Sequence, residues 1–197
     1  MAREAAQLLY SGSVKEYKQA KEEAARRLGL DAVPSNFDVA LELDLLAEET
    51  ERDRSAFLIH AREQGLRLMG HLAEFGPRLI GSVWRGTARR GSDIDISVYA
   101  QDSDHVLKKL EGASLVVDRV EESVSPERGG MRRSRHIIIR LEDGMEAEVA
   151  VRPPGEQDLV ERCDIYGDPK RGLSLGELER LMKRDPLRRF VPRRRRR

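Results

Sequence analysis

The spacing of apolar residues divides this chain into a helical first part and a strand-rich second part. Up to about residue 75, apolar side chains recur every three or four positions, which is the spacing of amphipathic helices. This pattern predicts one helix that ends at Gly29, a second that opens at Pro34 and a third over residues 53–74. Ser13 stands three residues before a glutamate, and this capping-box spacing predicts the start of the first helix.

Beyond residue 75 the pattern changes to short strands separated by turn residues. Residues 93–99 alternate strictly between polar and apolar side chains, and Asp143-Gly144 favours a hairpin turn. The predicted strands cover residues 78–82, 93–99, 115–120, 136–141 and 145–151, and the predicted helices of this part cover residues 104–110, 156–163 and 174–183. The polar, glycine-containing residues 122–133 predict a mobile loop.

These elements predict an α+β protein whose core is one small mixed β-sheet. Residues 1–74 are expected to form an N-terminal helical segment, residues 75–155 the sheet core, and residues 156–197 C-terminal helices with an arginine-rich tail. A length of 197 residues suits one compact domain, or a small domain with a helical extension.

Composition narrows the class of protein. Charged residues make up 36% of the chain and hydrophobic residues 39%, so the core must be thin and aliphatic. The single cysteine, Cys163, excludes an intramolecular disulfide framework and a cysteine-based zinc site, and it favours a reducing compartment. No segment approaches the ~18 apolar residues that span a bilayer, and the first residues lack the apolar stretch of a signal peptide. We therefore expect a cytoplasmic protein with no membrane partner.

Basic residues are concentrated at the C-terminus. Residues 183–197 hold nine basic residues and one acid, whereas the first 182 residues hold 27 basic and 34 acidic residues, a net charge of −7. Arg193 to Arg197 carry too much charge to pack, so we expect this tail to be disordered in the free protein. Its expected partner is a polyanion, RNA above all, bound through its phosphates. The alternative is that the tail only balances the negative charge of the first 182 residues or keeps the protein in solution.

Two aspartates in the alternating strand are the first candidates for chemistry. Asp93 and Asp95 share one strand face, about 6.6–7 Å apart along the chain, while Ile94 and Ile96 point into the core. Two carboxylates on one face repel each other unless a cation lies between them, and hard divalent cations prefer oxygen ligands. The pair therefore predicts a site for Mg²⁺ or Mn²⁺, where two ions about 3.5–4 Å apart can activate an attacking oxygen and stabilise a leaving phosphate.

The residues before this strand predict a phosphate site. Gly81 permits close approach of the backbone, and Ser82 offers an N–H and a hydroxyl group to phosphate oxygens. Arg85, Thr87 and Arg90 follow in the connection, where they are expected to extend the nucleotide-binding site with hydrogen-bond donors and positive charge. Together with the aspartate pair, these residues predict transfer of a nucleoside monophosphate from a triphosphate, with pyrophosphate leaving.

The run Gly-Ser-x3-Gly-Thr-Ala-Arg-x2-Ser-Asp-Ile-Asp-Ile, from Gly81 to Ile96, resembles the signature of the DNA polymerase beta-type nucleotidyltransferase superfamily. It is most similar to the minimal nucleotidyltransferases of bacteria and archaea. The resemblance implies that the Gly-Ser pair contacts the phosphates of a nucleoside triphosphate and that the Asp-x-Asp pair binds Mg²⁺. It also implies a third acid from a later strand. The family-like strand pattern extends to about Val151, whereas residues 1–70 fall outside the minimal domain.

The third acid must come from residues 145–151, where Glu146 and Glu148 share the polar face. We expect Glu148 to be the third catalytic acid and metal ligand, because the third acid of the superfamily usually leads directly into an apolar strand end. Glu146 remains the alternative. His136 precedes an apolar run, and we interpret it as a strand-surface residue rather than as a base.

Two classes of function fit these residues. The first is a Mg²⁺-dependent nucleotidyltransferase whose acceptor is a protein, an RNA or a small molecule. The second is a module that binds nucleic acid or a toxin, antitoxin-like, on a nucleotidyltransferase scaffold with little turnover. The intact Asp-x-Asp pair favours catalysis, because a scaffold has no need to keep two repelling acids.

Overall fold

The computed structural model of the protein describes residues 1–127 and 130–193, without the side chains of residues 124–133. Contacts divide the chain into two compact units. The helical unit comprises residues 1–54 and 162–169 together with the C-terminus from Pro192, and the sheet unit comprises residues 55–161 and 170–191. These units cut across the three predicted segments, so the division at residues 74 and 155 stays a prediction.

The described residues of the helical unit include three helices: α1 (Ala2–Tyr10), α2 (Tyr17–Leu28) and α3 (Asn36–Thr50). Small side chains bring them together. Ala6 of α1 and Ala20 and Ala24 of α2 are fully buried in one apolar cluster with Val39 of α3. Because alanine adds almost no width to a helix, these residues let the helix backbones approach closely around the buried Leu8 and Leu9.

The caps of these helices confirm one predicted start and correct another. The Ser35 side chain accepts a hydrogen bond from the Asp38 N–H and caps α3, as a helix opening at this point requires. The capping box predicted at Ser13 is wrong, because the N-cap of α2 is Glu16, whose side chain makes no capping hydrogen bond. The Ser13 hydroxyl instead lies 2.8 Å from that of Ser11.

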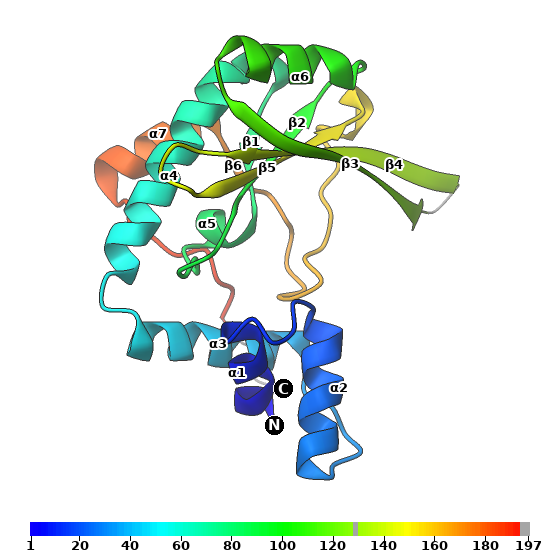
Figure 1. Ribbon diagram of the computed structural model, residues 1–197, viewed down its shortest axis with the longest axis vertical. Coiled ribbons are helices and arrows are strands. Elements are labelled where there is room, and N and C mark those ends of the chain that lie inside the picture. The colour runs from blue at the N-terminus through cyan, green and yellow to red at the C-terminus, as the bar shows by residue number, and fades with distance from the viewer. Residues whose placement is uncertain (128–129, 194–197) are drawn as a thin grey trace. The chain divides into compact units, whose positions relative to one another are not determined.

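The sheet unit is built on six described strands: β1 (Arg78–Leu79), β2 (Ile94–Tyr99), β3 (Val116–Glu127), β4 (Gly130–Arg140), β5 (Glu146–Arg152) and β6 (Leu173–Ser174). Their order is β3-β4-β5-β2-β1-β6, and the long β3–β4 hairpin extends beyond the other strands (Figure 1). β2 and β5 run parallel, and the remaining neighbours are antiparallel. Helices with a mixed sheet confirm the predicted α+β class.

One face of the sheet forms the core of this unit. α4 (Arg54–His71), α6 (Ser103–Gly112) and α7 (Leu175–Arg184) contribute apolar side chains to the same cluster as Ile94, Ile96 and Val98 of β2. Gly65 lets α4 lie close to the sheet, because a Cβ atom there would come within 3.3 Å of Leu79 Cδ1. The acidic positions of β2 alternate with these core residues and therefore face the other way. Among the described helices, none has the length and apolar character to cross a bilayer.

The segment predicted as a mobile loop, residues 122–133, is β-strand wherever the structure describes it. Ser123 of β3 pairs with Ser134 of β4, and their hydroxyl oxygens lie 2.7 Å apart. Residues 122–133 are mostly polar in sequence, so hydrophobic alternation gave no signal of a strand. The loop prediction failed because these backbones pair as strands without that signal.

Two further elements differ from their predictions. The strand predicted over residues 78–82 ends at Leu79, and the short helix α5 (Gly81–Arg85) begins two residues later. The helix predicted over residues 156–163 is absent from this fully described segment, where a 3-10 turn at Pro154–Glu156 leads into irregular chain. A second 3-10 turn covers Ala73–Phe75 and precedes the sheet.

Candidate metal and nucleotide site

Three carboxylates converge on the sheet face opposite the core. Asp95 of β2 and Glu148 of β5 are direct partners in the parallel register, and Asp93 lies one residue before β2 on the same side. Each offers a carboxylate oxygen, and these three atoms lie within 4.8 Å of one another. Asp93 is exposed and the other two are half-buried, so the cluster is open to a ligand. The structure thus brings together all three predicted metal ligands.

Burial and mutual repulsion raise the pKa of two carboxyl groups in this cluster. Burial, followed by repulsion from Asp93 and Glu148, raises the pKa of Asp95 from 3.8 to about 7, although the charge of Lys170 opposes the shift. Packing around the Asp93 carboxylate, followed by repulsion from Glu148, raises its pKa as well. Because a divalent cation relieves such repulsion and binds oxygen ligands, the three residues fit Mg²⁺ or Mn²⁺.

The alternative third acid, Glu146, has a different environment. Its carboxylate pairs with Arg140 Nη2 at 2.9 Å, and the same Arg140 nitrogen lies 3.5 Å from Asp118. Glu146 is therefore part of a surface ion-pair network on β4, β5 and β3. This arrangement favours Glu148 as the third ligand.

His136 has a contact with the acidic cluster that the sequence did not reveal. Its Nδ1 lies 2.5 Å from Glu148 Oε1, and its Nε2 lies 2.9 Å from the hydroxyl oxygens of both Ser123 and Ser134. In the β4–β5 register His136 is opposite Ala150, which places it diagonally across from Glu148. The imidazole therefore fixes the orientation of the Glu148 carboxylate. Only the strand register could have indicated this contact.

Gly81 meets the acidic cluster directly. Its φ of +68° lies in the left-handed region, and a Cβ atom there would overlap the Asp95 carboxylate. The adjacent Ile80 N–H donates to the Asp95 carbonyl at 2.9 Å, which ties the two segments together. The sequence predicted that Gly81 leaves space for a phosphate group. In the structure the Asp95 side chain lies in the space next to Gly81. Ser82 follows, half-buried in the first turn of α5.

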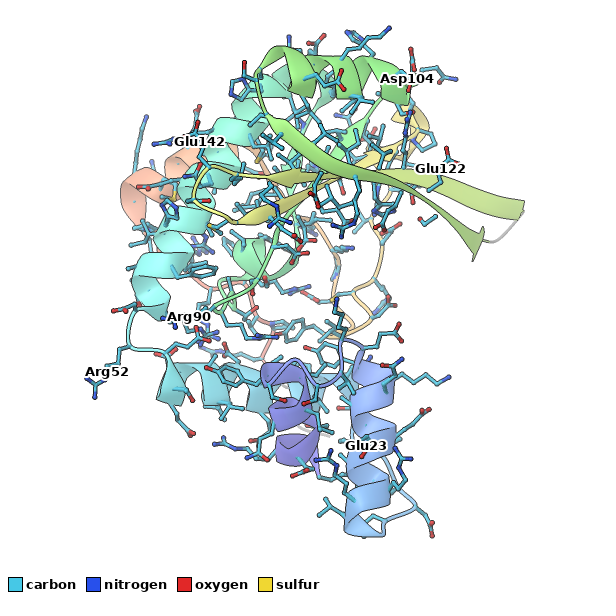
Figure 2. All side chains as sticks on the ribbon, in the orientation of Figure 1. Glu23, Arg52, Arg90, Asp104, Glu122 and Glu142 are labelled. Atoms are coloured by element: carbon cyan, nitrogen blue, oxygen red, sulfur yellow. The ribbon has the colours of Figure 1, made fainter. Side chains whose placement is uncertain are left out.

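The other predicted phosphate contacts separate into two groups. Arg85 is buried, its Nη1 donates to the Phe190 carbonyl at 2.8 Å, and its guanidinium carbon lies 4.4 Å from the Trp84 ring centroid. This placement indicates a structural contact rather than a phosphate contact. Thr87 is half-buried and donates its N–H to the Ser82 carbonyl at 3.0 Å, and Arg90 is exposed on the loop that follows α5 (Figure 2).

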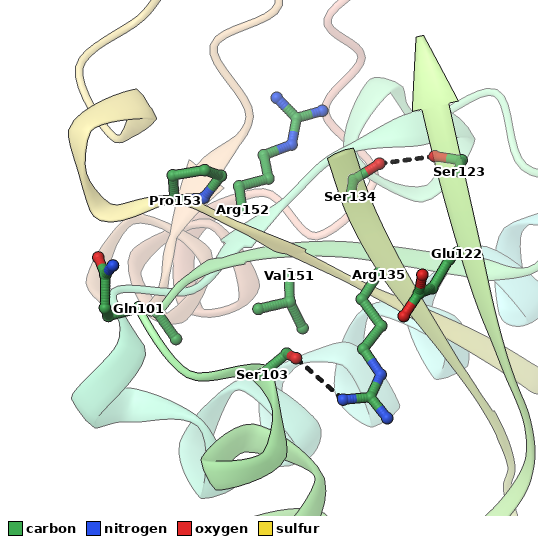
Figure 3. Close-up of a pocket in the computed structure, with 10 residues that line it drawn as sticks. Gln101, Ser103, Glu122, Ser123, Ser134, Arg135, Val151, Arg152 and Pro153 are labelled. Carbon is green, nitrogen blue, oxygen red and sulfur yellow. Dashed lines mark hydrogen bonds between the residues drawn. The ribbon is translucent and has the colours of Figure 1, made fainter. Parts of the chain in front are cut away.

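A pocket of about 270 Å³ lies at the C-terminal ends of β2 and β5 (Figure 3). On β5 its lining begins three residues beyond Glu148, and its Ser123 and Ser134 contact the same His136 that contacts Glu148. Of the arginines that line it, Arg135 pairs with Asp104 and Arg152 pairs with Glu161. Because both already have acidic partners, their charge identifies no ligand.

Comparison with known proteins assigns a family to part of the chain. The family model "Nucleotidyltransferase domain" matches residues 77–154. A solved structure titled "Structural Basis for the Activity of a Cytoplasmic RNA Terminal U-transferase" matches with 13% sequence identity and a TM-score of 0.33. That match covers 59% of this chain and 34% of the other, so this chain spans about a third of its neighbour. No curated protein matches.

The segment matched by the family model contains the whole site. Gly81 and Ser82 lie near its start, and the three acids of the cluster lie within it. The motif, the mixed sheet and the family model therefore agree on the same stretch of chain. Residues 77–154 belong to the nucleotidyltransferase-like superfamily.

Proposed function

We propose that this protein is a Mg²⁺-dependent nucleotidyltransferase that moves a nucleoside monophosphate from a nucleoside triphosphate to an acceptor and releases pyrophosphate. The observation that carries the proposal is the convergence of Asp93, Asp95 and Glu148 beside Gly81, within the segment matched by the family model. A scaffold without turnover has no use for three carboxylates that repel one another.

In this proposal Asp93, Asp95 and Glu148 hold Mg²⁺ or Mn²⁺. A divalent ion bound there supplies a Lewis acid for the transferring phosphoryl group. The protein's own contribution is to hold Asp95 and Glu148 on paired strands, with Asp93 directly before β2, and to orient Glu148 through His136. This preorganisation means that the ligands need not move when charge develops in the reaction.

The triphosphate is bound on the α5 side of the cluster. Ser82 offers its N–H and hydroxyl group to phosphate oxygens, and the bare Gly81 backbone keeps that serine next to Asp95. Thr87 and Arg90 extend this side with a hydroxyl group and a positive charge. Arg85 acts through α5 itself, because its guanidinium is buried against Phe190 and Trp84.

The acceptor and the base of the nucleotide stay open in the proposal. A protein, an RNA or a small molecule all fit the chemistry. RNA is favoured only by the basic tail, of which residues 194–197 lie outside the described part of the chain. A cytoplasmic location agrees with the lone Cys163.

The proposal is tested by incubating the protein with each of the four α-labelled nucleoside triphosphates, Mn²⁺ or Mg²⁺, and cell extract. The expected result is a labelled acceptor with one or more triphosphates, and no label with Asp95→Asn. The labelled species then identifies both the donor and the class of acceptor. Absence of transfer by a parent protein that binds Mn²⁺ and nucleotide would favour the alternative, a binding module for nucleic acid or a toxin with little turnover.

A further inference from the structure

A segment near the C-terminus is fastened to α5. This segment, residues 186–190, is called the strap here. The Phe190 N–H donates to the Arg85 carbonyl at 2.9 Å, and the Phe190 ring stacks on Trp84 with centroids 6.3 Å apart. At the end of α5, a Cβ atom on Gly86 would lie 3.0 Å from a strap carbonyl oxygen. The strap therefore packs against the side of α5 without space between the two backbones.

One buried side chain joins the strap to α5. Arg62 of α4 has 0% exposure. Its Nε donates to the Val83 carbonyl at 3.1 Å, and its Nη2 donates to the Trp84 carbonyl at 3.0 Å, both in α5. Its Nη1 donates to the Pro186 carbonyl at 2.5 Å, and Nη2 donates to the Arg188 carbonyl at 2.9 Å, both in the strap. A single guanidinium thus connects three segments.

These four hydrogen bonds are charge-assisted. Burial lowers the pKa of Arg62 to about 10, and attraction to Asp185 opposes that shift, so the guanidinium is protonated at neutral pH. A charged, planar donor that meets four carbonyls fixes both distance and orientation, which a lysine ammonium cannot reproduce. Loss of the guanidinium leaves buried carbonyls without donors.

The helix α5 needs such support from outside. With five residues it is far shorter than an isolated helix that is stable in water. Its first residue, Gly81, lies against the Asp95 carboxylate, and Ser82 is the next residue along the chain. A small displacement of α5 either pushes the Gly81 backbone into Asp95 or withdraws Ser82 from the metal cluster.

We propose that Arg62 is a positioning residue for the nucleotide site, because it clamps α5 between α4 and the strap and so holds Ser82 beside the acidic cluster. The inference rests on the proposed function, since it concerns the same phosphate side. It assigns a role in nucleotide binding to residues that touch neither metal nor nucleotide. The strap thus helps to position the site, although it begins more than thirty residues after the family-matched segment.

The test compares nucleotide and metal binding in the full-length parent and in Arg62→Lys. A non-hydrolysable nucleoside triphosphate and Mn²⁺ are titrated separately, at a temperature where circular dichroism shows both proteins to be folded. The Kd for the nucleotide is expected to rise about tenfold, as when one charged hydrogen bond is lost, while the Kd for Mn²⁺ stays unchanged. Hydrogen exchange of the Thr87 amide, which donates to the Ser82 carbonyl, should accelerate.

Two further variants separate positioning from general destabilisation. Phe190→Ala loosens the strap and leaves Arg62 intact, so it should weaken nucleotide binding in the same direction, and it serves if Arg62→Lys does not fold. Leu110→Ala opens a cavity in α6, where Leu110 has 0% exposure, and should lower the melting temperature while nucleotide affinity stays at the parent value.

The outcomes distinguish this inference from the proposed function. If the parent binds nucleotide and the Arg62 and Phe190 variants bind it equally well, the positioning role is wrong and the proposed function stands. If Leu110→Ala loses as much affinity as Arg62→Lys, Arg62 is a structural residue only. A parent that binds no nucleotide overturns both proposals.

Discussion

The two sides of the candidate site are built in opposite ways. The metal side places Asp95 and Glu148 on β2 and β5, two neighbouring strands whose register makes them partners, and Asp93 directly before β2. The phosphate side places Gly81 and Ser82 on a five-residue helix whose position depends on contacts from α4 and the strap. Regular pairing explains the first side, whereas the second depends on residues distant in sequence. Substitutions should therefore affect metal binding and nucleotide binding separately.

The largest effect is expected on the metal side. Asp93→Ala and Asp95→Ala should each abolish nucleotidyl transfer and leave the fold intact, because each removes a ligand from a cluster of three carboxylates. Loss of several kcal/mol of transition-state stabilisation corresponds to a decrease of roughly a thousandfold or more in rate. The measurement is transfer of labelled nucleotide at saturating Mg²⁺, with circular dichroism as a control for folding. Transfer at the parent rate by either variant would remove that residue from the site.

Gly81 is the position where the two sides meet, so its substitution should damage both. In Gly81→Val the new side chain overlaps the Asp95 carboxylate, and the φ of +68° disfavours any β-branched residue. Affinity for Mn²⁺ and for nucleotide should both fall. Ser82→Ala is the matched comparison: it should weaken nucleotide binding roughly ten- to a hundredfold and spare Mn²⁺. Equal loss of both ligands in Ser82→Ala would contradict the separation of the two sides.

The raised pKa of Asp95 predicts a pH-dependent difference in stability in metal-free protein. Its pKa is about 7 in the folded protein and about 4 in an unfolded chain, so folding favours the protonated form. The neutral Asp95→Asn variant should therefore unfold at higher denaturant concentration than the parent at pH 8. Between pH 7 and pH 4 the parent takes up a proton on folding, so its free energy of unfolding rises as the pH falls. The advantage of the variant therefore disappears over this range. Denaturant titrations in EDTA at several pH values measure this difference, and a constant advantage would contradict the pKa shift.

The smallest effect on the site is expected from the tail. Deleting residues 193–197 should flatten the dependence of log affinity for RNA on log salt, by up to several units if all five arginines contact phosphate. Nucleotide binding should not change, because the site residues lie elsewhere in the chain. If full-length and truncated protein bind RNA equally at low salt, the tail only balances the negative charge of the first 182 residues or keeps the protein in solution.

The metal side could be predicted from sequence because its signals are local. Strict alternation placed Asp93 and Asp95 on one strand face, and the same reasoning put Glu146 and Glu148 together on another. Alternation alone could not choose between these two glutamates, because the choice depends on register and on the Arg140 ion pair.

The motif predicted which residues form the phosphate side, but not the contacts that hold α5 in position. Arg62 and Arg188 are 126 positions apart, and no local pattern connects them. Arg85 could not be distinguished from a phosphate ligand, because a sequence does not show whether an arginine side chain is buried. The extension of β3 and β4 over residues 122–133 was missed for a related reason: these residues are mostly polar in sequence and show no hydrophobic alternation, so only backbone pairing defines the strands there.

The central claim is that Asp93, Asp95 and Glu148 form one divalent-metal site, and a calorimetric Mn²⁺ titration tests it most directly. The parent should bind Mn²⁺, Glu148→Gln should bind it clearly more weakly, and Glu146→Gln should bind it like the parent, because Glu146 pairs with Arg140 instead. Both substitutions remove one negative charge from the same strand, so net charge cannot explain a difference. Equal weakening by the two variants, or weaker binding by Glu146→Gln, would contradict the assignment.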